Sequence, residues 1–181
     1  MKPIQSFLQE KYIISSKNYM HNFKDWKSGK ADKIFIVGIS GSGKSALGKK
    51  LAEGSKSKYI SLDTLGWKIS KEINKFLVIA TPYKKYQKIL FGRMEETLKK
   101  LKNRTVIEGV EVMRLNFKYV SSYPIIILNT SILKSTMRAY FRNRKEYNDP
   151  VIDTIVDLYF NQSVFIKHLD DFTNKLKALD K

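Results

Sequence analysis

An eight-residue loop near the start of the chain constrains the fold most strongly. Residues 38–45 read Gly-Ile-Ser-Gly-Ser-Gly-Lys-Ser and fit the pattern G-x-x-x-x-G-K-[ST]. A short apolar, β-branched run, Ile34–Val37, precedes the loop, and residues 45–53 read as a helix that stops at Gly54. A strand, a glycine-rich loop and a helix in this order predict a phosphate-binding loop, also called Walker A.

The residue types of this loop suit a polyphosphate. Glycines let the backbone turn tightly with no Cβ beside a phosphate, so the amides of Gly41–Ser45 can point inward at the start of a helix. Lys44 would then reach the β- and γ-phosphates, and the Ser45 hydroxyl would bind Mg²⁺. The alternative is a plain glycine turn with no ligand. The predicted phosphate-binding residues are Gly38, Ser40, Gly41, Ser42, Gly43, Lys44, Ser45 and Ala46.

Composition limits the partners. The 34 Lys and Arg residues against 17 Asp and Glu give a formal net charge of +17, which favours a polyanionic partner: nucleoside phosphates, nucleic acid or both. The absence of cysteine excludes disulfides, thiolate metal sites and a cysteine nucleophile, and is compatible with a cytoplasmic location. No apolar run approaches the roughly 20 residues of a membrane span, so no membrane partner is expected.

The chain alternates predicted strands and helices, which implies right-handed βαβ units and a parallel sheet between helical layers. Strands are expected at Ile34–Val37, 59–62, 105–107 and 124–128, and none is evident after residue 150. We therefore predict a three-layer α/β/α domain over residues 31–181 with a helical C-terminus. Residues 1–30 read as a helical N-terminal extension anchored by Phe23 and Trp26, with a poorly ordered tail as the alternative.

Helical periodicity marks the remaining segments. Pro82 is expected to open a long helix, whereas residues 67–80 are ambiguous between strand and helix. A helix is expected from Ser131 to about Lys145, followed by a polar loop over 143–150. Asp149-Pro150 would start a further helix, whose apolar pattern continues to the end through Phe165, Leu169, Phe172, Leu176 and Leu179.

Two carboxylates follow predicted strands. Asp63 ends the second strand and Glu108, beside Gly109, ends the third, so both are expected at the carboxyl edge of the sheet where such folds bind ligands. There Asp63 could hold Mg²⁺ or accept a proton from a substrate hydroxyl, and Glu108 could hold the metal or the acceptor. Asp63 could instead cap the next segment, and Glu108 could be a solvated charge. Glu111 is a weaker candidate.

The helix at 131–145 carries a second basic signal. Lys134, Arg138 and Arg142 recur every four residues, next to an apolar stripe of Leu133, Met137 and Phe141 that is expected to face the core. The basic stripe would then lean over the cleft, where arginines can stabilise charge on a transferring phosphoryl group. The alternative is a solvated basic helix.

Together these motifs resemble the P-loop kinases of the nucleoside-monophosphate-kinase and shikimate-kinase type over roughly residues 33–145. The resemblance implies ATP and Mg²⁺, places Asp63 near the acceptor, and likens Arg138, Arg142 and Arg144 to the arginines that lead into a mobile lid. The usual Asp-Gly-Phe-Pro-Arg run is Glu-Gly-Val-Glu-Val at 108–112 here, without its arginine. The Phe23…Trp26-Lys27 opening also resembles bacteriophage proteins with a kinase-like Walker loop.

Three functions follow as hypotheses. The first is a kinase that transfers the γ-phosphate of ATP to a small-molecule or nucleotide acceptor. The second, favoured by the charge, is a polynucleotide 5′-kinase or a nucleic-acid-binding NTPase. The third is a nucleotide-dependent regulatory or binding protein with little turnover. Catalytic roles are predicted for Lys44, Asp63, Arg138 and Arg142, and metal-binding roles for Ser45, Asp63 and Glu108.

Overall fold

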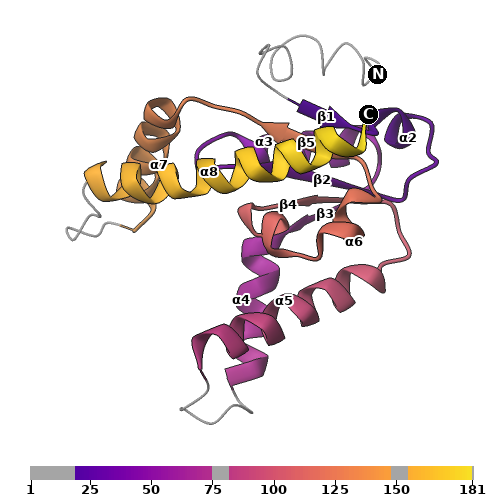
Figure 1. The fold of residues 1–181 in the computed structure, drawn as a ribbon, viewed down its shortest axis with the longest axis horizontal. Helices are drawn as coiled ribbons and strands as arrows, with labels where there is room; N and C mark the ends of the chain where they lie inside the picture. Colours follow the sequence, from indigo (N-terminus) through magenta and orange to yellow (C-terminus); the bar gives the residue numbers. More distant parts are fainter. Residues whose placement is uncertain (1–18, 75–81, 148–154, 181) are drawn as a thin grey trace.

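The computed structural model describes residues 19–74, 82–147 and 155–180, and it has a five-stranded sheet with helices on both faces (Figure 1). The strands lie in the order β1-β5-β2-β4-β3. They are β1 (Tyr19–His21), β2 (Lys33–Gly38), β3 (Lys58–Ser61), β4 (Thr105–Glu108) and β5 (Ile125–Leu128). The predicted three-layer α/β/α fold is confirmed. No helix in the described ranges is long and apolar enough to cross a membrane.

The helices surround this sheet in chain order. They are α2 (Phe23–Lys27), α3 (Lys44–Gly54), α4 (Leu62–Asn74), α5 (Tyr83–Lys99), the 3₁₀ helix η1 (Val110–Arg114), α6 (Phe117–Ser121), α7 (Ile132–Tyr147) and α8 (Ile155–Leu179). The predicted helix after Pro82, the helix near 131–145 and the helical C-terminus are present.

Strand β2 shows why the sheet is buried on both faces. It pairs in parallel with β4 and with β5, and all six of its residues are buried. Side chains alternate across a strand, so Ile34 and Ile36 pack with Trp26 and the apolar side of α3, whereas Phe35 and Val37 pack on the opposite face. That second cluster includes buried side chains of α4, α5 and α8. The central strand thus holds the glycine loop at its carboxyl end between two packed layers.

Strand β1 lies in the segment that the sequence assigned to a helical extension. It pairs antiparallel with β5, with Tyr19 opposite Ile127 and His21 opposite Ile125. The end of the described chain fixes it: Tyr19 donates a hydrogen bond to Asp180, and His21 Nδ1 lies 2.7 Å from Asp180 Oδ1. Only α2 shows the expected helix within 19–30, and residues 1–18 lie outside the described ranges.

Two predicted boundaries were wrong, and one open segment is now assigned. Strand β3 ends at Ser61, and α4 begins at once with Leu62, so Asp63 lies in the first turn of a helix rather than at the end of a strand. The segment left open between strand and helix, residues 67–80, is helical as far as Asn74, where α4 ends, and residues 75–80 lie outside the described ranges. Helix α7 runs on to Tyr147, where a loop from 143 was expected. The remainder of that loop, with Asp149-Pro150, lies outside the described residues.

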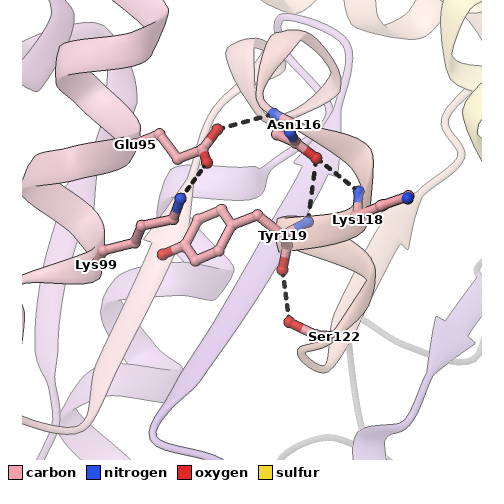
Figure 2. A network of polar contacts seen from close by, with 6 residues as sticks. All are labelled: Glu95, Lys99, Asn116, Lys118, Tyr119 and Ser122. Carbon is pink, nitrogen blue, oxygen red and sulfur yellow. Dashed lines mark hydrogen bonds and ion pairs between the residues drawn. The ribbon is translucent and has the colours of Figure 1, made fainter.

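A polar network joins α5 to α6 on one side of the sheet (Figure 2). The Asn116 side chain accepts hydrogen bonds from the backbone amides of Lys118 and Tyr119 at 3.0 and 3.4 Å, which caps α6. The Asn116 amide in turn donates to Glu95 Oε2 at 3.1 Å, and Lys99 pairs with the other Glu95 oxygen at 2.6 Å. This network fixes the chain that leaves η1 against α5.

Candidate active site

The phosphate-binding loop adopts a conformation that only glycine suits at its centre. Gly41 has φ of +75°, and a Cβ added there would collide with the carbonyl oxygen of Ser135 in α7. The loop and α7 therefore touch through backbone, because neither side offers a bulky side chain at this point. This contact places the start of α7 over the loop.

The loop opens into a cavity of about 400 Å³. The loop after β2, the end of β4 and the starts of α3, α4 and η1 converge there, as expected for the carboxyl edge of a parallel sheet. The lining residues are Ser40, Gly41, Gly43, Lys44, Ser45, Ala46, Asp63, Glu108, Val110 and Arg138. Of the other predicted loop residues, Gly38 and Ser42 are buried and do not line the cavity.

Lys44 and Ser45 form the first turn of α3, and both side chains contact neighbours. Lys44 Nζ donates a 3.0 Å hydrogen bond to the backbone carbonyl of Ile39 within the loop. The Ser45 hydroxyl donates to Glu108 Oε1 at 3.3 Å. These contacts thus hold the side chains of Lys44 and Ser45 in place where they line the cavity.

Glu108 is a buried carboxylate at the end of β4, with 2% of its surface exposed. Its Oε1 also accepts a 2.9 Å hydrogen bond from the hydroxyl of Tyr59. Burial, with the nearby Glu108 charge as the second cause, raises the pKa of Tyr59 above the ordinary phenol value, so this hydroxyl keeps its proton. The hydroxyls of Ser45 and Tyr59 therefore hold Glu108 Oε1 beside the start of α3.

Tyr59 was not among the site residues predicted from the sequence, although a signal was present in α3. Gly48 lies inside that helix, where glycine costs about 1 kcal/mol relative to alanine. A Cβ at Gly48 would lie 2.8 Å from the Tyr59 ring, so this glycine makes room for the ring beneath α3. A glycine in the middle of a helix indicated a close packing partner.

Asp63 reaches the cavity from the first turn of α4 and is exposed. The half-buried carboxyl of Glu111, in η1, lies against it. Burial first, and the adjacent Asp63 second, raise the pKa of Glu111 to about 7. Glu111 is therefore able to hold a proton near neutral pH.

Helix α7 is oriented differently from the sequence expectation. Its apolar stripe does not face the core, since Leu133 and Phe141 are 63% and 58% exposed, and the buried side chains among residues 132–141 are Ser135, Thr136 and Ala139. Small side chains face inward because the helix backbone rests on the loop at Gly41. The Ser135 hydroxyl then donates a buried 2.7 Å hydrogen bond to Gln162 of α8.

Arg138 nevertheless lines the cavity from α7. Arg142 lies one turn further along the same helix, and its side chain is outside the described part of the structure. Within the described residues, no group of three or more His, Cys, Asp or Glu side chains could hold a metal ion.

No family model and no curated protein matches this sequence. Solved structures do align with this chain. Shikimate kinase from Acinetobacter baumannii in complex with shikimate aligns with a TM-score of 0.51 and 15% identity, over 80% of this chain and 79% of that one. A gluconokinase from Sinorhizobium meliloti 1021 aligns with a TM-score of 0.47 and 18% identity, over 74% and 73%. The chain therefore has the α/β fold of the P-loop kinases.

Proposed function

We propose that this protein is a kinase that transfers the γ-phosphate of ATP to a small-molecule or nucleotide acceptor. One observation carries the proposal: a glycine-rich loop with Lys44 and Ser45, two carboxylates and Arg138 all line the same cavity. Phosphoryl transfer needs positioning and positive charge more than covalent chemistry from the protein, and this set supplies both.

Phosphate binding would use the loop as it stands. The amides at the start of α3 lie at the positive end of the helix, where an anion is stabilised. The ammonium group of Lys44 donates to the backbone carbonyl of Ile39. A bound triphosphate would offer this group a charged acceptor, which forms a stronger hydrogen bond than a carbonyl does. The loop therefore needs little rearrangement to bind a nucleotide.

The donor set also fits Mg²⁺, which prefers oxygen ligands and usually combines one or two protein groups with substrate phosphates. The Ser45 hydroxyl and the Glu108 carboxylate lie 3.3 Å apart and would hold the ion, with Asp63 on the same cavity wall. When bound, the ion would neutralise charge on the β- and γ-phosphates.

Asp63 is the proposed general base. Its exposed carboxylate lines the cavity, so an acceptor hydroxyl bound there could give it the proton. The hydroxyl oxygen forms the new bond to the γ-phosphorus, the bond from that phosphorus to the β-phosphate oxygen breaks, and ADP leaves. Arg138, and Arg142 on the same helix, would stabilise the charge on the equatorial oxygens during this step.

Nucleotide binding is tested by thermal unfolding with and without ATP and Mg²⁺. A ligand that binds only the folded state raises the melting temperature by mass action. The shift should be largely lost in Lys44→Ala and kept in Lys49→Ala, which removes an exposed lysine from the same helix. An equal shift in both variants would contradict the loop assignment.

The acceptor is tested by transfer of labelled phosphate from ATP to a panel of nucleosides, nucleotides, sugars and 5′-hydroxyl oligonucleotides. Transfer to a small molecule supports the proposal. Nucleotide binding with no transfer to any member would instead identify a regulatory or binding protein.

A polynucleotide 5′-kinase is the second candidate, and the surface of α4 and α5 favours it. Trp67 and Tyr83 are 63% and 71% exposed, and exposed lysines lie beside them. These lysines are Lys68, Lys71, Lys84, Lys85 and Lys88. Exposed rings among cations can stack on bases while the cations contact phosphates. Phosphorylation of oligonucleotides, with affinity that falls steeply as salt rises, would select this candidate.

A further inference from the structure

A second cavity, of about 320 Å³, lies between η1, α6 and α8. The residues that line it are all different from those of the phosphate-binding cavity. The 3₁₀ helix η1 borders both, with Val110 on the first and Arg114 on the second. Because this cavity contains none of the phosphate-binding residues, its ligand need not be a nucleotide.

Three aromatic side chains line this cavity: Phe117, Phe165 and Phe172. Phe117 of α6 and Phe172 of α8 meet edge to face, with ring centroids 5.6 Å apart and planes at 88°. Phe172 is buried, and Phe165 lies two turns earlier on the lining face of α8. The cap at Asn116 and its bond to Glu95 (Figure 2) fix the start of α6. Phe117 is the first residue of that helix, so its position is set by the same contacts. A flat apolar group would find a preformed surface here.

Three charged side chains line this cavity: Arg114, Asp171 and Lys175. Arg114 lies over the rings of Phe91 and Phe165, 5.7 and 5.9 Å from their centroids. Asp171 and Lys175 are exposed on α8. No hydrogen bond joins these three side chains to any partner among the described residues, and none of them has an ion pair there within 4.0 Å.

Asp171 and Lys175 have the spacing at which two side chains of a helix commonly form an ion pair. Residues four apart face the same way on a helix, and an acidic residue before a basic one is the favourable order for an ion pair. Among the described residues no ion pair within 4.0 Å joins the two, and both line the cavity. A ligand with opposite charges on neighbouring atoms could pair with both, and its carboxylate could also reach Arg114.

We propose that this cavity binds a small zwitterion that carries an apolar ring, of the free amino-acid kind. The ring would pack against Phe117, Phe165 and Phe172, the carboxylate would bind Lys175 and Arg114, and the ammonium would bind Asp171. The cavity volume suits such a ligand, since small-molecule sites begin at about 300 Å³. This site does not depend on the proposed kinase activity.

The test uses L-phenylalanine as the probe and measures binding to the full chain by ligand-detected NMR titration. We expect saturable binding with a dissociation constant on the order of 1 mM or tighter, as its few atoms permit. Asp171→Asn and Lys175→Gln should each weaken the binding of L-phenylalanine about tenfold, because each removes one hydrogen bond to a charged group. Asp170→Asn and Lys167→Gln change exposed neighbours on α8 that do not line the cavity, and should leave it unchanged.

Two ring compounds with a single charge test the zwitterion itself. 3-Phenylpropanoate should bind more weakly than L-phenylalanine, and Asp171→Asn should not change its affinity. Likewise, Lys175→Gln should not change the affinity for 2-phenylethylamine. Lys44→Ala should keep L-phenylalanine binding, which separates this site from the nucleotide cavity. The proposal is overturned by no saturable binding at 10-fold above the expected constant, by equal loss in the control variants, or by tighter binding of either singly charged compound.

Discussion

The hydroxyl of Tyr59 donates a 2.9 Å hydrogen bond to the same oxygen of Glu108 that accepts from Ser45 of the phosphate-binding loop. Tyr59 thus holds in place a buried carboxylate proposed to bind the metal ion, although its own side chain does not line the cavity. The packing of its ring against Gly48 leaves the hydroxyl little freedom to turn away.

Tyr59→Phe should therefore raise the Mg²⁺ concentration needed for half-maximal phosphate transfer. A hydrogen bond to a charged group is worth about 1.5–3 kcal/mol, which corresponds to roughly 10- to 100-fold. The phenylalanine ring keeps the contact with Gly48, so the fold should survive. Tyr83→Phe removes an exposed hydroxyl and serves as the control. An unchanged Mg²⁺ requirement in Tyr59→Phe would show that Glu108 does not need this donor.

Gly41→Ala should abolish nucleotide binding and lower the free energy of unfolding. The added methyl group would collide with the Ser135 carbonyl, and the positive φ would add strain, with a combined cost of about 2–4 kcal/mol. Gly92→Ala is the matched control, because a Cβ there meets nothing within 4 Å and the site lies inside α5. That variant should be more stable by about 0.4–1 kcal/mol. Urea unfolding curves compare the two.

Arg138→Lys should lower kcat about 10- to 100-fold while the affinity for ATP changes little. Lysine keeps the charge but lacks the planar, two-pronged donor that fits phosphoryl oxygens. Arg93→Lys, on the exposed side of α5, should have no effect. The same loss is expected for Arg142→Lys, and steady-state kinetics of both variants would show whether one arginine or two contact the transferring group.

Stability of the nucleotide-free protein should fall as the pH rises through the range in which Glu111 titrates. Its pKa lies near 4.5 when unperturbed and is raised to about 7 in the folded state by burial and by Asp63. The folded state therefore binds this proton more tightly, so the free energy of unfolding decreases between these two values. Glu111→Gln should remove about 2 kcal/mol of this decrease. Glu96→Gln, an exposed change on α5, should retain it in urea unfolding at pH 5 and pH 8.

The phosphate-binding loop could be predicted from sequence because its geometry is local. Residues 38–45 lie together along the chain, and the strand and helix that hold them are adjacent. Asp63 and Glu108 could be placed at one edge of the sheet because parallel strands bring their ends together. Their partners, Glu111 and Tyr59, depend on side-chain packing between elements that the periodicity of a single strand or helix does not reveal.

Two errors have a common physical cause. Strand β1 has three residues and no apolar alternation, so it depends on β5 and on Asp180, both far along the chain. The apolar stripe of α7 was assigned to the core on hydrophobicity, but the close approach of Gly41 admits only small residues such as Ser135 and Ala139 on the buried face. In both places a tertiary contact overrides the local pattern.

The contacts of Asp180 with Tyr19 and His21 of β1 have a consequence for protein synthesis. Tyr19 and Asp180 are 161 residues apart, so β1 leaves the ribosome long before the residue that holds it. At about 5–20 residues per second, roughly 8–30 s separate the two. During that interval β1 is not yet held against the edge of β5 by Asp180. An unpaired strand edge is a template for pairing with other chains. Nascent chains that end before residue 180 should therefore aggregate more readily than the chain that includes it.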